Sequence, residues 1–225
     1  MAAPHRLDLY AHVHKALRLF MTDTLQRLGT LDIDDPVDLA AALAQLDALL
    51  QAAQHHVQRE NDFIHPALEA RSPGASAAIA GEHREHLEAI AALHAEAAAL
   101  RALPSDAAAE RLYRHFAAFV AENFMHMGEE EMRHNQALWA HYADAELNAL
   151  HGRLLASVTP QEMSELLRWM MPALNPAERA LVVAGLPTAV QAPVLAAARP
   201  VLDDTAWAKL CRALGQAPMP GLVEA

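Results

Sequence analysis

Two segments of the chain place a histidine and a glutamate four residues apart. His56 and Glu60 form the first pair, in QHHVQREND, and His126 and Glu130 form the second, in FMHMGEEEM. Residues at i and i+4 share one face of an α-helix, so each pair presents an imidazole and a carboxylate to the same side. Both groups bind metal ions, and the single cysteine excludes a site built from several thiolates. A metal bound by this chain would therefore be held by histidine and carboxylate side chains.

Further histidines fall on the apolar stripes of predicted helices, in a chain that contains 14 of them. His14 shares a helix face with Leu17, and His83 and His86 lie on the stripe that continues to Ile90. An unpaired buried charge costs on the order of several kcal/mol, so a ligand shared by all the inward polar residues accounts for them best. The inward residues are His14, His56, Glu60, His83, His86, His126 and Glu130.

The elements that must position these residues are helices. Apolar residues recur at helical spacing through most of the chain, without a convincing alternating strand pattern. Asp35 before Pro36, and Ser76 and Ser105 after chain breaks, are candidate helix caps. They divide the first part into four helices, expected roughly at residues 5–29, 36–70, 76–102 and 106–142. Helices of this length with short links predict an all-α, antiparallel up-down-up-down four-helix bundle, in which all seven residues can meet near one level.

From about residue 145 the pattern changes to shorter helices. The segments 159–162 and 175–178 each have the sequence of a capping box with proline at the first helical position. We therefore predict a bundle over residues 1–145 and a C-terminal helical extension over residues 146–225 that packs on it.

The extension contains Trp169, Met170 and Met171, residue types that are enriched in the cores of interfaces. Two interpretations follow from this composition. The extension either closes one side or end of the bundle, or it forms the interface of a homodimer or of a complex with a signalling partner.

The order of the histidine and carboxylate motifs resembles the hemerythrin family, including its bacterial HHE-domain members. That family has a lone histidine on the first helix, His-x3-Glu on the second, one or two histidines on the third, and a histidine followed four or five residues later by Glu or Asp on the fourth. The resemblance covers about residues 7–145, and "WMMPALNPAER" in the extension is similar to a stretch beside some bacterial hemerythrin-like domains. The matching residues are His14, His56, Glu60, His83, His86, His126 and Glu130.

The resemblance implies a non-haem di-iron site with the two carboxylates, and an oxo or hydroxo group, as bridges and the histidines as terminal ligands. Two positions depart from the family pattern. The third-helix histidines are spaced His83-x2-His86, so one or both could ligate. Glu129 and Glu131 compete with Glu130, which we favour because a residue at i+5 lies about 140° round a regular helix unless a bulge intervenes.

Histidines next to these motifs are assigned supporting roles. His55 and His65 flank the pair of His56 and Glu60 as candidate hydrogen-bond partners of the ligands. His134 lies one turn past Glu130, where it could support a ligand or act as one.

Several functions suit a di-iron site of this kind. The resemblance implies binding of dioxygen or another small diatomic ligand, or sensing of oxygen, nitric oxide or redox state. The alternatives are a di-iron enzyme that activates peroxide or dioxygen, iron handling, and a site occupied by zinc. We favour a binding protein, because no general acid is evident in the sequence, although Tyr10 lies one turn from His14.

Charge and hydropathy narrow the expected partners and location. The formal net charge of −11 argues against nucleic acid and anionic membranes as partners. No apolar run reaches the ~18 residues of a membrane span, and the first residues lack the apolar region of a signal peptide. We therefore expect a cytoplasmic protein.

Overall fold

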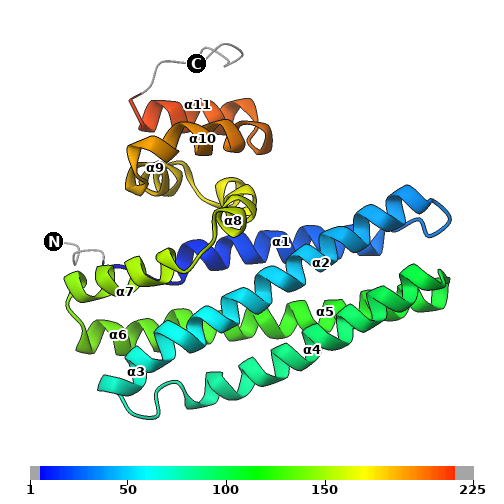
Figure 1. Cartoon of the computed structure of the whole chain (residues 1–225), viewed down its shortest axis with the longest axis horizontal. Helices are drawn as coiled ribbons and strands as arrows, with labels where there is room; N and C mark the ends of the chain where they lie inside the picture. Colours follow the sequence, from blue (N-terminus) through cyan, green and yellow to red (C-terminus); the bar gives the residue numbers. More distant parts are fainter. Residues whose placement is uncertain (1–5, 216–225) are drawn as a thin grey trace. The chain divides into compact units, whose positions relative to one another are not determined.

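The computed structural model describes residues 6–215, which form helices joined by short turns (Figure 1). No strand occurs within this described range, and none of its helices is long and apolar enough to cross a membrane. The long helices are α1 (Ala11–Gly29), α2 (Pro36–Arg59), α4 (Ala77–Ala102) and α5 (Asp106–Glu129). The shorter ones are α3 (His65–Arg71), α6 (Asn135–His141), α7 (Asp144–Ala156), α8 (Pro160–Ala173), α9 (Pro176–Gly185), α10 (Thr188–Ala198) and α11 (Asp204–Ala213). The prediction of an all-α fold is confirmed.

The chain divides into two compact units. Within the described range, the first contains residues 6–11 together with Phe20–Ser157, and the second contains His12–Leu19 together with residues 158–215. Whether residues 1–145 and 146–225 form separate domains stays a prediction.

Local capping sets the first residues of three long helices. Asp35 accepts hydrogen bonds from the backbone N–H groups of the first turn of α2, and Ser105 does the same for α5. Helix α1 begins at Ala11 and not at residue 5, which lies outside the described range. The side chain of Asp8 accepts hydrogen bonds from the backbone N–H groups of Tyr10 and Ala11, so the helix starts there.

The core of the first unit is formed by α2, α4 and α5 together with α1 from Phe20 onward. Leu46 of α2 and Phe116 of α5 are completely buried in it, and burying such a side chain contributes about 1.5 to 3 kcal/mol. Gln45 of α2 donates a hydrogen bond to Thr24 of α1 across the same core. Helices α4 and α5 run side by side in opposite directions, as an antiparallel bundle requires (Figure 1).

The second unit has a separate apolar core. Met171 of α8, considered above for an interface, is completely buried in it, as is Leu210 of α11, and Trp207 is 2% exposed. The predicted capping boxes at residues 159–162 and 175–178 are both present and start α8 and α9.

Two of the predicted long helices contain a π-helical turn. These turns are η1 (Glu60–Ile64), between α2 and α3, and η2 (Glu130–His134), between α5 and α6. Each begins at the glutamate of a His-x3-Glu pair. In η1 the backbone N–H of His65 bonds to the carbonyl of Glu60, five residues back. The residue that follows is Pro66, which has no N–H to continue the α-helical hydrogen bonds.

Candidate metal centre

Four polar side chains from four elements of the first unit meet in its interior. They are Glu60 of η1, His83 of α4, His126 of α5 and Glu130 of η2, and none is more than 3% exposed. Each offers a nitrogen or carboxylate oxygen, and these four atoms lie within 4.8 Å of one another. The i, i+4 spacing and the helical stripes therefore bring together the residues that they predicted for the second, third and fourth helices.

Each carboxylate lies between two imidazoles. The Oε1 atom of Glu60 is 3.2 Å from Nε2 of His56, and its Oε2 atom is 3.4 Å from Nε2 of His83. The Oε1 atom of Glu130 is 3.3 Å from Nε2 of His126 and 3.5 Å from Nε2 of His83. Glutamate and imidazole therefore alternate through the cluster.

Hydrogen bonds on the outer side orient two of these imidazoles. Nδ1 of His83 is 2.8 Å from Oδ1 of Asn61, and Nδ1 of His126 is 2.7 Å from Oε2 of Glu82. Because both partners are acceptors, each Nδ1 carries a proton, and in a neutral ring Nε2 then has its lone pair directed inward. The two Nε2 atoms are 3.1 Å apart. Lone pairs and carboxylates that converge in this way need a positive charge between them, so the donor set fits metal ions.

Protons supply this charge when metal is absent. Burial disfavours a charged His83, but the hydrogen bonds and charges of Glu130 and Glu60 outweigh burial and raise its pKa to about 9. Burial also disfavours a charged His126, but the hydrogen bond and charge of Glu130, together with Glu82 and Glu60, outweigh burial and raise its pKa. Burial and Glu60 favour a protonated Glu130, yet His126 and His83 lower its pKa overall. The metal-free cluster thus favours protonated His83 and His126 beside an ionised Glu130.

Residues 5–138 match the Hemerythrin HHE cation binding domain family. The chain belongs to this family. Comparisons with curated proteins and with solved structures found no match. The buried histidines and glutamates lie inside the matched region, so the cluster is the candidate metal-binding site of the HHE domain.

The two remaining predicted ligands, His86 and His14, are also buried. His86 of α4 is 4% exposed, and its ring lies 4.6 Å from that of His126, measured between centroids. Burial, with the charges of His126 and His83, lowers its pKa to about 4. His14 of α1 is completely buried. It lies in the segment that belongs to the second unit, and its role as a ligand stays a prediction.

The three consecutive glutamates at positions 129–131 differ in burial. Glu130 is completely buried, whereas Glu129 and Glu131 are partly exposed. Glu129 forms an i, i+4 ion pair with Arg133. Burial and the nearby histidines therefore support the choice of Glu130.

Two further histidines approach the cluster, His65, which was predicted as a hydrogen-bond partner of the ligands, and His134, which was predicted to support a ligand or to act as one. His65 and His134 are 7% and 1% exposed, and each offers a ring nitrogen within 4.8 Å of the other and of a Glu130 oxygen. The His65 ring stacks on that of His83, with centroids 4.8 Å apart. In a regular helix His65 would lie about 140° from Glu60, and the π turn brings it back. Pro66, which follows His65, was the one sequence signal of this irregularity.

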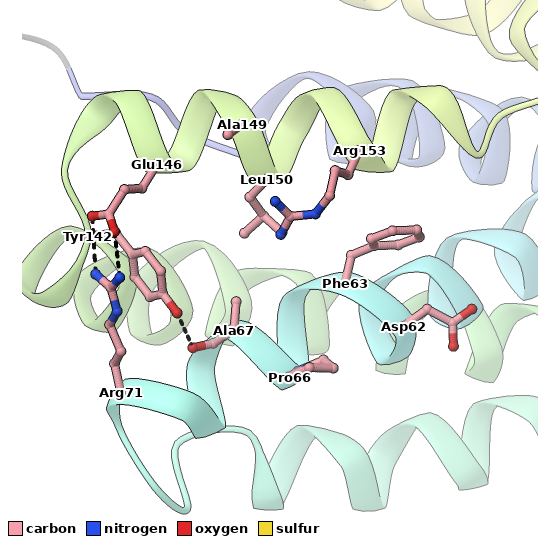
Figure 2. A pocket seen from close by; sticks show the side chains of 10 residues that line it. All are labelled: Asp62, Phe63, Pro66, Ala67, Arg71, Tyr142, Glu146, Ala149, Leu150 and Arg153. Carbon is pink, nitrogen blue, oxygen red and sulfur yellow. Dashed lines mark hydrogen bonds and ion pairs between the residues drawn. The ribbon is translucent and has the colours of Figure 1, made fainter.

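A cavity of about 570 Å³ lies elsewhere on the first unit, between α7 and the segment formed by η1 and α3 (Figure 2). Arg71 bridges it by an ion pair with Glu146, and the Tyr142 hydroxyl donates a hydrogen bond to the Ala67 carbonyl. None of the buried histidines or glutamates of the cluster lines this cavity. It is therefore separate from the candidate metal centre.

Proposed function

We propose that the HHE domain holds two iron ions bridged by Glu60 and Glu130 and binds dioxygen, or senses oxygen, nitric oxide or redox state, at this centre. The observation that supports the proposal is the position of each carboxylate between two imidazoles. A carboxylate has two oxygen atoms, so one side chain can bind two metal ions, each of which also binds a different histidine.

The individual residues have distinct parts in this proposal. His56, which contacts Glu60, and His126, which contacts Glu130, are terminal ligands, and His83 lies between both carboxylates. Asn61 and Glu82 keep Nδ1 of His83 and His126 protonated, which leaves Nε2 free to bind a cation. His14 and His86, both buried, enter the proposal as the further ligands that the sequence predicts. Iron, when bound, supplies the electron exchange on which dioxygen binding depends.

Imidazole and carboxylate ligands suit iron, and an incomplete set of protein ligands leaves a position for a small exogenous molecule. Zinc accepts the same ligand types, so occupation by zinc and an iron-handling role are the alternatives. An enzyme that activates peroxide or dioxygen would use the same cluster and would differ in the fate of the bound oxygen.

Metal content and a visible spectrum test the proposal. The protein is purified without added metal, its metal content is measured, and the apo form is loaded with Fe(II) under anaerobic conditions and then exposed to air. We expect two iron ions per chain and a charge-transfer absorption that appears in air and disappears on degassing. Irreversible oxidation would indicate an enzyme, and exclusive zinc binding would contradict an iron site.

Substitutions locate the metal. In the His56→Ala and Glu60→Ala variants we expect fewer than two iron ions per chain, because each change removes a ligand atom from the cluster. His115→Ala, at an exposed position of α5, is the matched control and should keep wild-type stoichiometry. Two iron ions retained in both cluster variants would show that the residues are assigned wrongly.

A further inference from the structure

His65 and His134 form a pair of buried imidazoles that the proposed ligand set does not use. The Nε2 atom of each is buried and has no hydrogen-bond partner among residues 6–215. Together with a Glu130 oxygen, the ligand atoms of this pair lie within 4.8 Å of one another. Two nitrogen atoms no more than 4.8 Å apart can both lie within hydrogen-bond distance of one acceptor atom between them. The pair is therefore placed to bind one atom near Glu130.

The hydrogen-bond partner of His134 Nδ1 bears on whether Nε2 of the same ring is a hydrogen-bond donor or an acceptor. The hydroxyl oxygen of Tyr10 is 2.9 Å from Nδ1 of His134. Burial, followed by the charges of Glu60 and Glu130, raises the pKa of Tyr10 well above its ordinary value, so the phenol keeps its proton and can donate a hydrogen bond to Nδ1. In the tautomer that accepts this hydrogen bond at Nδ1, His134 carries its own proton on Nε2 and presents an N–H donor to the space beside Glu130.

The charge of the site decides between a cation and an anion as the occupant. In the air-oxidised centre, Glu60, Glu130 and an oxo or hydroxo bridge would neutralise three or four of the six positive charges of two iron(III) ions, and Glu82 at the edge of the cluster would neutralise part of the rest. A third cation beside Glu130 would add uncompensated positive charge in a region that excludes water, which is strongly unfavourable. A bound anion reduces the net charge and receives hydrogen bonds that are stronger than those to a neutral acceptor.

We propose that His65 and His134 form a hydrogen-bond donor site for a small ligand of the metal centre that is anionic when bound, such as azide or hydroperoxide. This inference rests on the proposed function, because an anion next to Glu130 needs the cations of the centre. It assigns ligand selectivity to two residues outside the metal ligands, with Tyr10 as the residue that positions His134.

Azide binding tests this assignment. The iron-loaded protein is oxidised in air and titrated with sodium azide, and the dissociation constant is measured from the charge-transfer absorption. One hydrogen bond to a charged ligand contributes about 1.5 to 3 kcal/mol, so we expect His134→Leu and His65→Leu each to weaken azide binding by roughly tenfold or more. His134→Gln, which keeps an N–H donor, should recover part of the affinity, and Tyr10→Phe should give a smaller loss. His115→Leu serves as the exposed control.

Iron stoichiometry, measured on the same samples, separates this inference from the proposed function. We expect two iron ions per chain in the wild type and in all of these variants. An azide affinity that is unchanged within twofold in both leucine variants, or no azide binding to the two-iron wild type, would overturn the donor site and leave the metal centre in place. Three metal ions in the wild type and two in the leucine variants would show that the pair binds metal instead. A wild type without iron would overturn both.

Discussion

Raising the pH from 6.5 to 9 should destabilise the metal-free protein, chiefly through His83. Its pKa is about 9 in the folded chain and about 6.5 in an unfolded one. The folded state therefore binds this proton more tightly. The resulting stabilisation is fully present below about pH 6.5 and is lost as the pH rises through 9. This difference in the pKa of His83 between the folded and unfolded chains corresponds to about 3 kcal/mol of the free energy of unfolding.

Chemical denaturation of chelator-treated protein at several pH values between 6.5 and 9 measures this loss. The His83→Gln variant keeps a side-chain amide that can bond to Asn61, but it has no group that titrates in this range. Its free energy of unfolding should fall by about 3 kcal/mol less than that of the wild type over the same interval. The exposed control, His115→Gln, should retain the wild-type slope. His126, whose pKa is also raised, should leave a residual slope of the same sign in the variant.

Two outcomes would refute the reasoning. A wild-type stability that is constant or increases from pH 6.5 to 9 would show that no proton is held tightly in the metal-free cluster. Equal slopes in the wild type and His83→Gln would show that the proton is not on His83. Metal-loaded protein should show the opposite trend over this interval, because cations replace the protons and metal affinity increases as the histidines lose them.

Two further predictions concern groups around the centre and the start of α5. Replacing Glu82 by alanine removes the acceptor of the His126 Nδ1 proton and should weaken metal binding by about 10- to 100-fold in a chelator competition, whereas Glu85→Ala at an exposed position of α4 should have no effect. Equal losses in both variants would point to a general charge effect. Ser105→Ala should lower the free energy of unfolding by about 1 kcal/mol, because the cap of α5 is lost. Ser105→Gly should lower it by only a few tenths of a kcal/mol, and equal effects of the two substitutions would contradict a capping role.

Most of the architecture could be predicted from the sequence, because the signals that start helices are local. Asp35 with Pro36, and Ser105, were expected as caps and act as caps. Ser76 was also expected to cap a helix, but its hydroxyl donates a hydrogen bond to Glu69 instead. The outcome at Ser76 depends on a neighbouring loop, which a pattern of single residues does not describe.

Part of the candidate site could also be predicted from the sequence, because helical spacing is a local property as well. Helical spacing identified His56, Glu60, His126 and Glu130, since residues four apart share a face in any α-helix. It did not bring His65 to that face, because the argument assumed a regular helix through residues 36–70. The π turn depends on a balance between backbone hydrogen bonds and the packing of side chains that are distant in sequence.

The π turn at η1 also bears on how relatives of this protein should be aligned. Deleting one residue, for example Asp62, would let an ordinary α-helix run through the segment, and the equivalent of His65 would then lie four residues after the glutamate, about 40° round the helix and still on the face of the cluster. A relative of unchanged length with a regular helix here would instead place it five residues after the glutamate, about 140° round and away from the cluster. An alignment that refuses a one-residue gap after the glutamate would therefore pair His65 with the wrong residue of a shorter relative and miss the equivalent of the proposed donor.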